Sequence, residues 1–486
     1  MRPVVIRRVP FVSSQRFVIT NVRSINTIKK PDNNERDVPD SWTISQSFTE
    51  WAKGFNKNYL KQRQDELMKF SMPYYGNQIK GLNSFSLQEP YNEQGQFLNE
   101  IRVENNNDTD NNAKNNKDIA SRNHIVMLHG YQASSGWFYK NFHGLIENNP
   151  NTTIHALDMI GHGLSSEPIN KIKDETNKKA INIIFDDSTI ENIKHIHKSL
   201  FLPKRFTIDT TNYLNFFQNQ YQLIEQIENE YVESIENWRK LNQIDQFDLI
   251  GHSLGGYVSL CYAMKYPDNI KKLILVSPGG IERSPFAISN PRIQELRDLQ
   301  VINHLPDKIE FNCSYSVEDY SFLGRLPIIR RFFKWFWMNK LSLQDYLRIA
   351  GPFGPKILSK NHFKKLARPK VIDKFSEINL LTSYIYQTFF KRKFGDTAIQ
   401  YIFTSSIVAK YPMLDRIHNL NPKINTLWLY GQHDWMYSDC GKAACKILNR
   451  IGSKSEFDLI SKSGHNVYLD NSIEFNSKVK KFLNLK

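Results

Sequence analysis

Five short apolar runs, separated by longer polar stretches, predict the strands of a buried sheet. Each run is five residues long and is bounded by turn-forming or polar residues, the pattern of strands covered on both faces. Between the second and third runs, residues 222–241 repeat apolar side chains at helical spacing. Strands alternating with helices predict an α/β fold with a mostly parallel, doubly wound sheet. The runs lie at 124–128, 153–157, 272–276, 426–430 and 456–460.

A sixth apolar run, 247–250, leads directly into the sequence Gly-His-Ser-Leu-Gly-Gly at 251–256. A serine with glycines two positions before and after it, between a strand and a helix, is the G-x-S-x-G nucleophile elbow. Gly251 and Gly255 are required because a Cβ there would meet neighbouring backbone. We therefore expect Ser253 to be a nucleophile on a tight turn that opens a helix over 254–265.

The base and the acid that such a serine needs follow two later strands. Asp434 comes just after the run 426–430, and His465 follows the last run. Loops at the carboxyl ends of parallel strands reach the same edge of the sheet, so both side chains are expected beside Ser253. Asp439 and Asp470 are the rival acids. Asp439 lies one helical turn too far along, and Asp470 is assigned a supporting role.

The oxyanion of an acyl-transfer intermediate needs two backbone N–H donors. One is predicted at Leu254, directly after the nucleophile, and the other at Tyr131, in the loop after the first apolar run. Gly130 would let that loop approach the substrate closely. His129 is expected to orient the loop by hydrogen bonding rather than to take part in chemistry.

Polar insertions divide the chain. Two of them, 166–222 and 284–422, interrupt the predicted sheet, and insertions at such points commonly cover the ligand-binding edge. An asparagine-rich tract, 104–118, cannot pack a core and is predicted to be a disordered loop. The expected divisions are a presequence (1–31), an N-terminal segment (32–121), a core (122–283), a helical lid (284–422) and the end of the core (423–486).

Basic residues are concentrated at the N-terminus. Residues 1–31 hold seven arginines and lysines, several serines and threonines, and no acidic residue, the composition of a mitochondrial transit peptide. A plain basic tail is the alternative. The whole chain carries a formal charge of +15, which favours an anionic partner such as a membrane or nucleic acid. Because no nucleic-acid-binding motif accompanies the charge, a membrane is preferred.

The predicted lid contains a basic, aromatic stretch at 326–338. Its apolar residues fall on one face of a helix, and thirteen residues are too few to span a bilayer. We expect this helix to lie on an anionic membrane, although a lid helix packed on the core would show the same pattern. Headgroup or membrane contacts are assigned to Arg330, Arg331, Phe333, Lys334 and Trp337.

The sequence predicts no cofactor or metal. No P-loop or dinucleotide motif accompanies the strands, and the four cysteines show neither metal-ligand spacing nor a disulfide framework. No apolar run is long enough to span a bilayer. A globular protein with at most peripheral membrane attachment is expected.

Several motifs together resemble one branch of the α/β-hydrolase superfamily, the branch of lipid hydrolases and acyltransferases that includes the N-acyl-phosphatidylethanolamine lysolipase and the lipid-droplet coactivator of triglyceride lipase. The resemblance extends through most of 122–486. Within the branch, the presequence and the 166–222 insertion make the chain similar to fungal cardiolipin-specific deacylases. The motifs are the elbow, HGYQASSGWF, LDMIGHGLS, YVESIENWR, YLRIAGPFGP, YPMLDRIHNL and SGHNVYLD.

The resemblance implies a phospholipase that removes an acyl chain from cardiolipin at the matrix face of the inner mitochondrial membrane. Two alternatives stay open. His465 and Asp470 form an H-x-x-x-x-D motif that the branch associates with acyl-CoA-dependent acylation of lysophospholipids. A non-catalytic coactivator is the other alternative, although the presence of Ser253 favours an enzyme.

Overall fold

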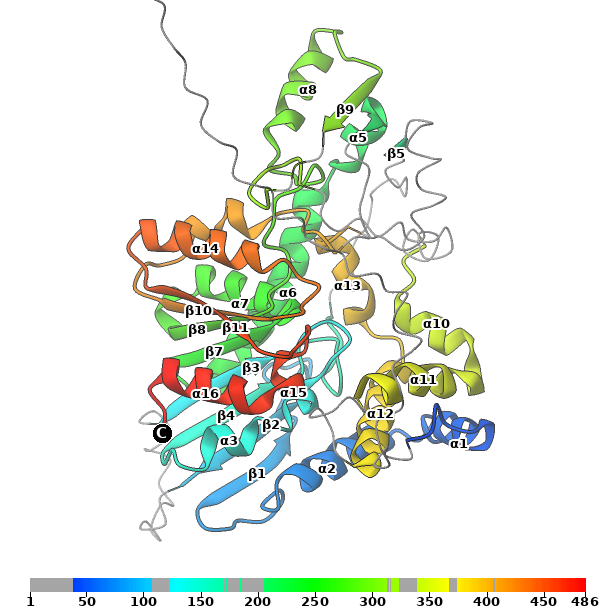
Figure 1. Cartoon of the computed structure of the whole chain (residues 1–486), viewed down its shortest axis with the longest axis vertical. Helices are drawn as coiled ribbons and strands as arrows, with labels where there is room; N and C mark the ends of the chain where they lie inside the picture. The colour runs from blue at the N-terminus through cyan, green and yellow to red at the C-terminus, as the bar shows by residue number, and fades with distance from the viewer. Residues whose placement is uncertain are drawn as a thin grey trace, which may run out of the picture. The chain divides into compact units, whose positions relative to one another are not determined.

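Eight strands form the central sheet of the computed structural model, in the order β1-β2-β4-β3-β7-β8-β10-β11 (Figure 1). The six strands from β4 to β11 are parallel, and β2 and β1 extend the sheet antiparallel at one edge. This confirms the predicted α/β-hydrolase fold class. The strands are β1 Leu82–Leu87, β2 Glu100–Asn105, β3 Asn123–Leu128, β4 Thr152–Leu157, β7 Phe247–His252, β8 Ile270–Val276, β10 Asn425–Gly431 and β11 Ser455–Ile460.

The structure describes residues 38–106, 122–169, 172, 183–184, 205–312, 314, 316–322, 339–366, 374–404 and 407–486. Contacts divide the chain into residues 1–39 and residues 40–486, and every assigned helix and strand belongs to the second unit. The presequence and nearly all of the asparagine-rich tract lie outside the described residues, so the predictions made for them remain predictions.

Helices cover both faces of the sheet because successive strand residues point to opposite sides and both sides are apolar. On one face, α6, α7 and α14 share a core with alternate residues of the strands, among them Val126, Leu249 and Leu275. On the other, α3 and α16 contact each other and lie in front of the sheet in Figure 1. These helices are α3 Phe142–Ile146, α6 Gln220–Leu241, α7 Leu254–Lys265, α14 Ser438–Arg450, α15 Val467–Asp470 and α16 Ser472–Leu483.

Each predicted strand is present, with boundaries that differ by at most two residues. The predicted helix at 222–241 begins two residues earlier, at Gln220, and the helix after the elbow has the predicted bounds. Short 3-10 turns join the elements. They are η3 Ser135–Phe138, η4 Pro267–Asn269, η5 Gly351–Phe353, η6 Met413–Asp415 and η7 Ile417–Asn419.

The two insertions meet in a second, three-stranded sheet that the sequence did not reveal. Strands β5 (Ile183–Ile184) and β6 (Arg205–Asp209) come from the first insertion, and β9 (Lys308–Asn312) comes from the second. Both pairings are antiparallel. Ile309 and Phe311 of β9 point into a small core with α5 (Thr210–Phe216) and α8 (Pro291–Val301). The predicted helical lid therefore also contains a strand, whose alternating exposed and buried residues follow strand periodicity.

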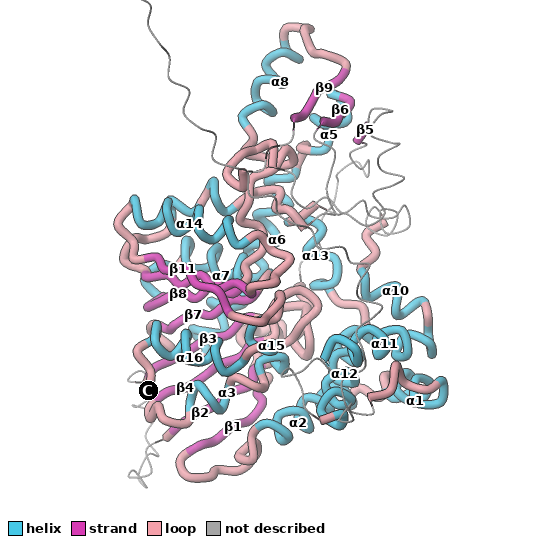
Figure 2. Tube along the Cα trace, in the orientation of Figure 1, coloured by secondary structure: helices cyan, strands magenta, loops and turns pink. Residues whose placement is uncertain are grey.

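Helices α10, α11, α12 and α13, also from the second insertion, form a cap at the right of Figures 1 and 2. Two N-terminal helices join it, since α1 contacts α11 and α2 contacts α12. Among the described residues, no helix is both long and apolar enough to cross a membrane. The cap helices are α10 Leu343–Ile349, α11 Gly354–Leu366, α12 Phe375–Phe390 and α13 Phe394–Ile402, and the N-terminal ones are α1 Ile44–Lys53 and α2 Tyr59–Ser71.

Candidate active site

Ser253 occupies the sharp turn between β7 and α7, with φ at +53° and ψ at −112°. A positive φ at a residue with a side chain is strained, and such strain is held only where the surroundings fix the backbone. Here the Ser253 N–H donates to the carbonyl of Val276 at 2.9 Å, and the Ser253 carbonyl accepts from Gly279 at 3.0 Å. Both bonds tie the turn to the end of β8.

The two predicted elbow glycines are required by close packing. A Cβ at Gly251 would lie 2.5 Å from the carbonyl oxygen of Gly255. A Cβ at Gly255 would lie 2.5 Å from the carbonyl oxygens of Leu128 and His129, at the end of β3. The nucleophile turn is thus pressed directly against the loop that is predicted to hold the oxyanion.

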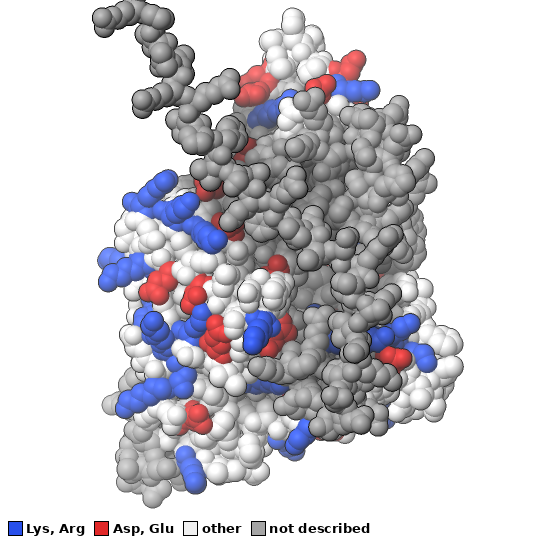
Figure 3. Space-filling view, viewed as in Figure 1, with Lys and Arg blue, Asp and Glu red and all other residues white. Residues whose placement is uncertain are grey.

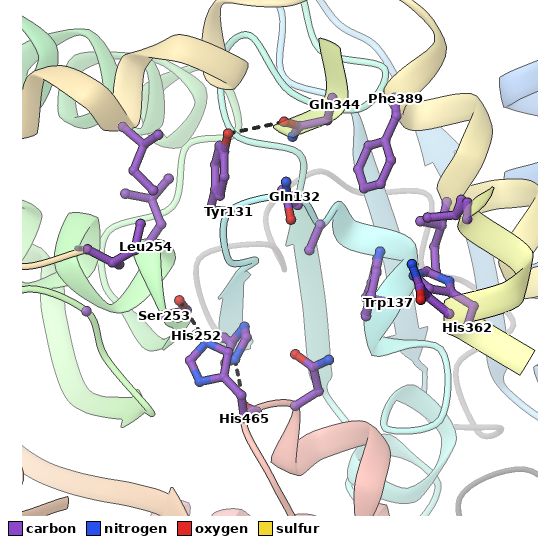
Figure 4. A pocket seen from close by; sticks show the side chains of 18 of the residues that line it. Tyr131, Gln132, Trp137, His252, Ser253, Leu254, Gln344, His362, Phe389 and His465 are labelled. Atoms are coloured by element: carbon purple, nitrogen blue, oxygen red, sulfur yellow. Dashed lines mark hydrogen bonds between the residues drawn. The ribbon is translucent and has the colours of Figure 1, made fainter. Parts of the chain in front are cut away.

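Ser253, His465 and Asp434 form a continuous hydrogen-bonded chain, although they are up to 212 residues apart. Figure 4 shows Ser253 and His465 of this chain. The Nε2 atom of His465 lies 3.1 Å from Ser253 Oγ, and its Nδ1 atom lies 3.0 Å from Asp434 Oδ1. The carboxylate can only accept, so Nδ1 carries the proton and Nε2 is left to accept from the serine. This is the arrangement that activates a serine hydroxyl.

Asp434 is buried and remains ionised. Its side chain is 1% exposed, and this burial raises its pKa, but the hydrogen bonds from His465 and from the Met436 backbone help to outweigh the effect, and the pKa lies below the ordinary value. The Met436 N–H also donates to Oδ1, at 2.9 Å. A charged carboxylate held on two sides fixes the orientation of the imidazole.

The loops that carry the acid and the base are joined through their backbones. The His433 N–H donates to the carbonyl of Ser463 at 2.9 Å, and a Cβ at Gly431 would lie only 2.1 Å from the carbonyl oxygen of Gly464. Asp470 contributes on the other side, where its Oδ2 accepts the Gly464 N–H at 2.8 Å. The H-x-x-x-x-D motif thus places Asp470 against the backbone next to His465, while the acid at the ring is Asp434.

His129 links the predicted oxyanion loop to the end of β4. The Met159 N–H donates to its Nε2 at 3.0 Å, so Nδ1 carries the proton and donates to the carbonyl of Gly130 at 2.8 Å. Burial lowers the pKa of His129 to about 4, which keeps the ring neutral near pH 7. The expected orienting role matches these contacts.

The loop passes close above the nucleophile. A Cβ at Gly130 would lie 3.0 Å from Ser253 Cβ, and Gln132 has a φ of +61°. Leu254 is the first residue of α7, where backbone N–H groups have no partner within the helix. Gly130 therefore lies next to Ser253, as Leu254 does in the chain, and the assignment of the Tyr131 and Leu254 N–H groups to an oxyanion stays a prediction.

His252 is a supporting residue that the sequence analysis missed. Its Nε2 donates to the backbone carbonyl of His465 at 2.9 Å, and its ring packs on those of His465 and Tyr468. Burial lowers the pKa of His252 to about 3, so the ring is neutral. The residue stands inside the elbow motif, but its contact with a loop 213 positions away could not be read from the sequence.

A largely apolar cavity of about 540 Å³ opens at Ser253 and extends under the cap (Figure 4). Helices α10, α11, α12 and α13 supply one wall, so the predicted lid covers the nucleophile. The Tyr131 hydroxyl donates to Gln344 Oε1 at 3.1 Å and to the carbonyl of Asp396 at 2.9 Å, which ties the oxyanion loop to the cap. The apolar cap residues that line the cavity include Leu347, Ile357, Leu358, Ile385, Phe389, Ile399 and Phe403.

The remaining site predictions divide into two groups. Asp439 is on α14, exposed and paired with Lys442, so it is not the acid of the site. The predicted membrane contacts Arg330, Arg331, Phe333, Lys334 and Trp337 all lie outside the described residues.

Sequence comparisons place this architecture in a known family. Residues 123–472 match the alpha/beta hydrolase fold family. The 1-acylglycerol-3-phosphate O-acyltransferase ICT1 of Saccharomyces cerevisiae is 28% identical over 74% of this chain and 81% of its own. Protein ECM18 of the same yeast is 30% identical over 74% of this chain and 71% of its own. The mouse 1-acylglycerol-3-phosphate O-acyltransferase ABHD5 is 27% identical over 74% of this chain and 77% of its own. The chain therefore belongs to the alpha/beta hydrolase fold family, in the lysophospholipid acyltransferase branch related to yeast ICT1.

Proposed function

We propose that this protein is a serine-dependent acyl-ester hydrolase of phospholipids, and that its substrate is cardiolipin, which it converts to monolysocardiolipin. The observation that carries the proposal is the hydrogen-bonded chain from Ser253 through His465 to Asp434, at the end of a large apolar cavity. An apolar cavity of this size suits an acyl chain.

In the proposed reaction, His465 Nε2 takes the proton of Ser253 Oγ as that oxygen attacks the acyl carbonyl. The N–H groups of Leu254 and Tyr131 stabilise the resulting oxyanion. The ester C–O bond then breaks, and His465 returns the proton to the departing lysolipid alkoxide. Water attacks the acyl-Ser253 ester in the same way, and the fatty acid leaves with Ser253 regenerated.

Cardiolipin is proposed on two grounds. The basic presequence and the 166–222 insertion make the chain similar to fungal cardiolipin deacylases, and its formal charge of +15 suits a dianionic lipid. The basic N-terminus and the basic aromatic stretch 326–338 support a location at the matrix face of the inner mitochondrial membrane. Fractionation of mitochondria, with and without carbonate extraction, tests this location; a protein found outside mitochondria would overturn it.

A lysophospholipid acyltransferase is the second candidate, because the relatives in yeast and mouse are named 1-acylglycerol-3-phosphate O-acyltransferases and 1-acylglycerol-3-phosphate is a lysophospholipid. Both candidates can share the acyl-Ser253 intermediate and differ in what attacks it: water in one case, a lysophospholipid hydroxyl in the other. In the acyltransferase, an acyl-CoA thioester would replace the phospholipid as acyl donor. Asp470 does not decide between them, since its carboxylate accepts from the Gly464 backbone.

The deciding experiment supplies purified protein with cardiolipin vesicles, or with acyl-CoA and a lysophospholipid, and follows all products by mass spectrometry. Wild type is expected to release fatty acid and monolysocardiolipin, and Ser253→Ala to release neither. Hydrolysis by Ser253→Ala above an empty preparation would refute the mechanism. Faster acyl incorporation into lysophospholipid than fatty acid release would establish the second candidate instead.

In cells, monolysocardiolipin should fall both in a strain lacking the protein and in one carrying Ser253→Ala. Loss of a different lysophospholipid would keep the mechanism and remove cardiolipin as substrate. Full complementation by Ser253→Ala would instead support a non-catalytic coactivator.

A further inference from the structure

Helix α1 has the reverse of the usual orientation for a surface helix. Its polar residues Ser47 and Glu50 are buried, whereas Ile44 and Phe48 are 63% and 54% exposed. Phe55, two residues past the end of the helix, is 64% exposed. Its ring contacts that of Trp51, which in turn contacts that of Phe48. A helix at a protein surface normally turns its apolar side chains toward the core.

Specific contacts hold α1 in this orientation. The Ser47 hydroxyl donates to the carbonyl of Pro352 at 2.6 Å and accepts the Lys356 N–H at 2.9 Å. Glu50 Oε1 accepts from Ser383 and from Gln387, each at 2.7 Å. Glu50 Oε2 also accepts from the Tyr59 hydroxyl of α2, at 3.2 Å. Rotating the apolar side of α1 inward would leave these buried polar groups without their partners.

The neighbouring part of the cap enlarges the exposed apolar area. The bond from Ser47 to Pro352 sets η5 against α1. Ile349, the last residue of α10, is 69% exposed, and Phe353, the last residue of η5, is 56% exposed. We call Ile44, Phe48, Phe55, Ile349 and Phe353 the outer apolar face. The elements that carry these residues contact one another, since η5 contacts both α1 and α10. Exposed apolar side chains gathered on neighbouring elements mark an interaction surface.

The charges around the outer apolar face are of one sign. On α1, on residues 54–58 and on α11, every exposed charged side chain is a lysine, since Glu50 is buried. The surface over α1 and α11, at the lower right of Figure 3, is accordingly mostly white and blue. Asp40 is a nearby exception and pairs with Lys364 at 3.4 Å. These lysines are Lys53, Lys57, Lys360, Lys364 and Lys365.

Cap helices α10 and α11 also line the cavity. Tyr346 and Leu347 of α10 and Asn361 and Lys365 of α11 belong to its wall, and Tyr346 is 39% exposed. Tyr346 precedes Ile349 by three residues, so the two lie on one side of α10. The rim of the cavity and the outer apolar face are therefore parts of one continuous surface.

We propose that the outer apolar face inserts into the surface of an anionic lipid bilayer, with the surrounding lysines at its headgroups, so that the cavity rim at Tyr346 meets the membrane. Aromatic side chains ringed by lysine suit this interface, where the apolar rings enter the acyl region and the ammonium groups stay among the phosphates. The face is separate from the stretch 326–338. That this face brings the cavity to its lipid substrate rests on the proposed function, whereas binding of the face to a membrane does not.

The test is co-sedimentation of full-length protein with phosphatidylcholine vesicles, with and without phosphatidylglycerol. Phe48→Ser/Phe55→Ser should lower the partition coefficient for anionic vesicles by about tenfold or more, because two aromatic side chains no longer leave water. Ile349→Ser/Phe353→Ser, in the part of the face that the cap supplies, should lower the same partition coefficient to a similar extent. Lys53→Gln/Lys57→Gln should weaken binding to anionic vesicles only.

Val301→Ser/Ile302→Ser is the matched control, since these residues are also exposed and apolar but lie at the end of α8, near the small sheet. It should bind like wild type, and so should Ser253→Ala, which separates membrane binding from the chemistry. Unchanged partitioning of both face variants would overturn the proposal. A self-associated wild type that the face variants convert to monomer would also overturn it, because the face would then be an interface between copies.

Discussion

The two sheets of this protein differ in what they carry. The large sheet presents Ser253, Asp434 and His465 at the carboxyl ends of three of its parallel strands. The small sheet is built from two insertions, and none of its described residues lines the cavity. The large sheet thus fixes the positions of the candidate catalytic groups, whereas the small sheet completes the structure around them. Substitutions in the large sheet should therefore change turnover, and those in the small sheet only stability.

The largest effect is expected for Asp434→Asn. An amide can donate to His465 Nδ1, which would turn the imidazole to the wrong tautomer, and kcat should fall about 10⁴-fold. Hydrolysis of a soluble ester measures this, with circular dichroism to check the fold. Asp439→Asn on the exposed surface of α14 is the control and should keep wild-type turnover. Equal losses in the two variants would mean that the acid has been misidentified.

Acid should destabilise the large sheet through His129. Burial lowers its pKa from 6.5 to about 4, so between these pH values the unfolded chain binds a proton that the folded chain does not. Stability is thus full above pH 6.5 and falls by up to about 3 kcal/mol as pH drops through this window. Urea unfolding at several pH values gives the free energy of unfolding as a function of pH. Between pH 4 and 6.5 its slope should be smaller in His129→Gln than in wild type, by the equivalent of about one proton. An unchanged slope would show that His129 does not contribute.

Asp470→Ala should have an intermediate effect. The variant leaves the Gly464 N–H without its acceptor, at a cost of about 1–3 kcal/mol, and loosens the loop beside His465. We expect kcat to fall about 10- to 100-fold, within the range of a misplaced catalytic group. Asp470→Asn keeps an acceptor oxygen and should recover much of this loss. If Asp470→Asn lowers kcat as much as Asp470→Ala does, Asp470 acts through its charge rather than by holding the loop.

Tyr131→Phe should act weakly, because the oxyanion donor is the backbone of Tyr131 and not its side chain. The lost hydroxyl removes the bonds to Gln344 and to the Asp396 carbonyl, worth about 1 kcal/mol each. We expect KM to rise several-fold with kcat nearly unchanged, in steady-state kinetics on a soluble ester. A loss confined to kcat would show instead that the hydroxyl supports the reacting groups.

Ile309→Ala should have no effect on turnover. The residue is buried in the core of the small sheet, and its truncation should cost that sheet about 2–5 kcal/mol. Hydrogen exchange at 205–209 and 308–312 would report the loss, while kcat stays at the wild-type value. A substantial drop in kcat would break the separation between the two sheets.

Sequence reasoning brought together residues that follow strands. Ser253, Asp434 and His465 each come after a parallel strand, and parallel strands bring their carboxyl ends to one edge of the sheet, so the pattern predicted that the three side chains would meet. The contact from His252 to the His465 carbonyl depends on how two loops pack, and nothing local encodes it. The orientation of α1 was equally hidden, because Ser47 and Glu50 look like solvent-facing residues until their partners in the cap are known.

The small sheet also constrains the order in which the chain can fold. Strands β6 and β9 pair Arg205 with Asn312, so 107 residues separate the partners (312 − 205), and that loop contains α6, β7, α7 and β8. Closing so long a loop through five-residue strands alone is unfavourable, since its entropy is lost before the pairing is gained. Docking of α6, β7, α7 and β8 into the large sheet would shorten the effective distance first. We therefore expect the small sheet to form late, with φ-values near zero at Ile309 while the elbow is already structured.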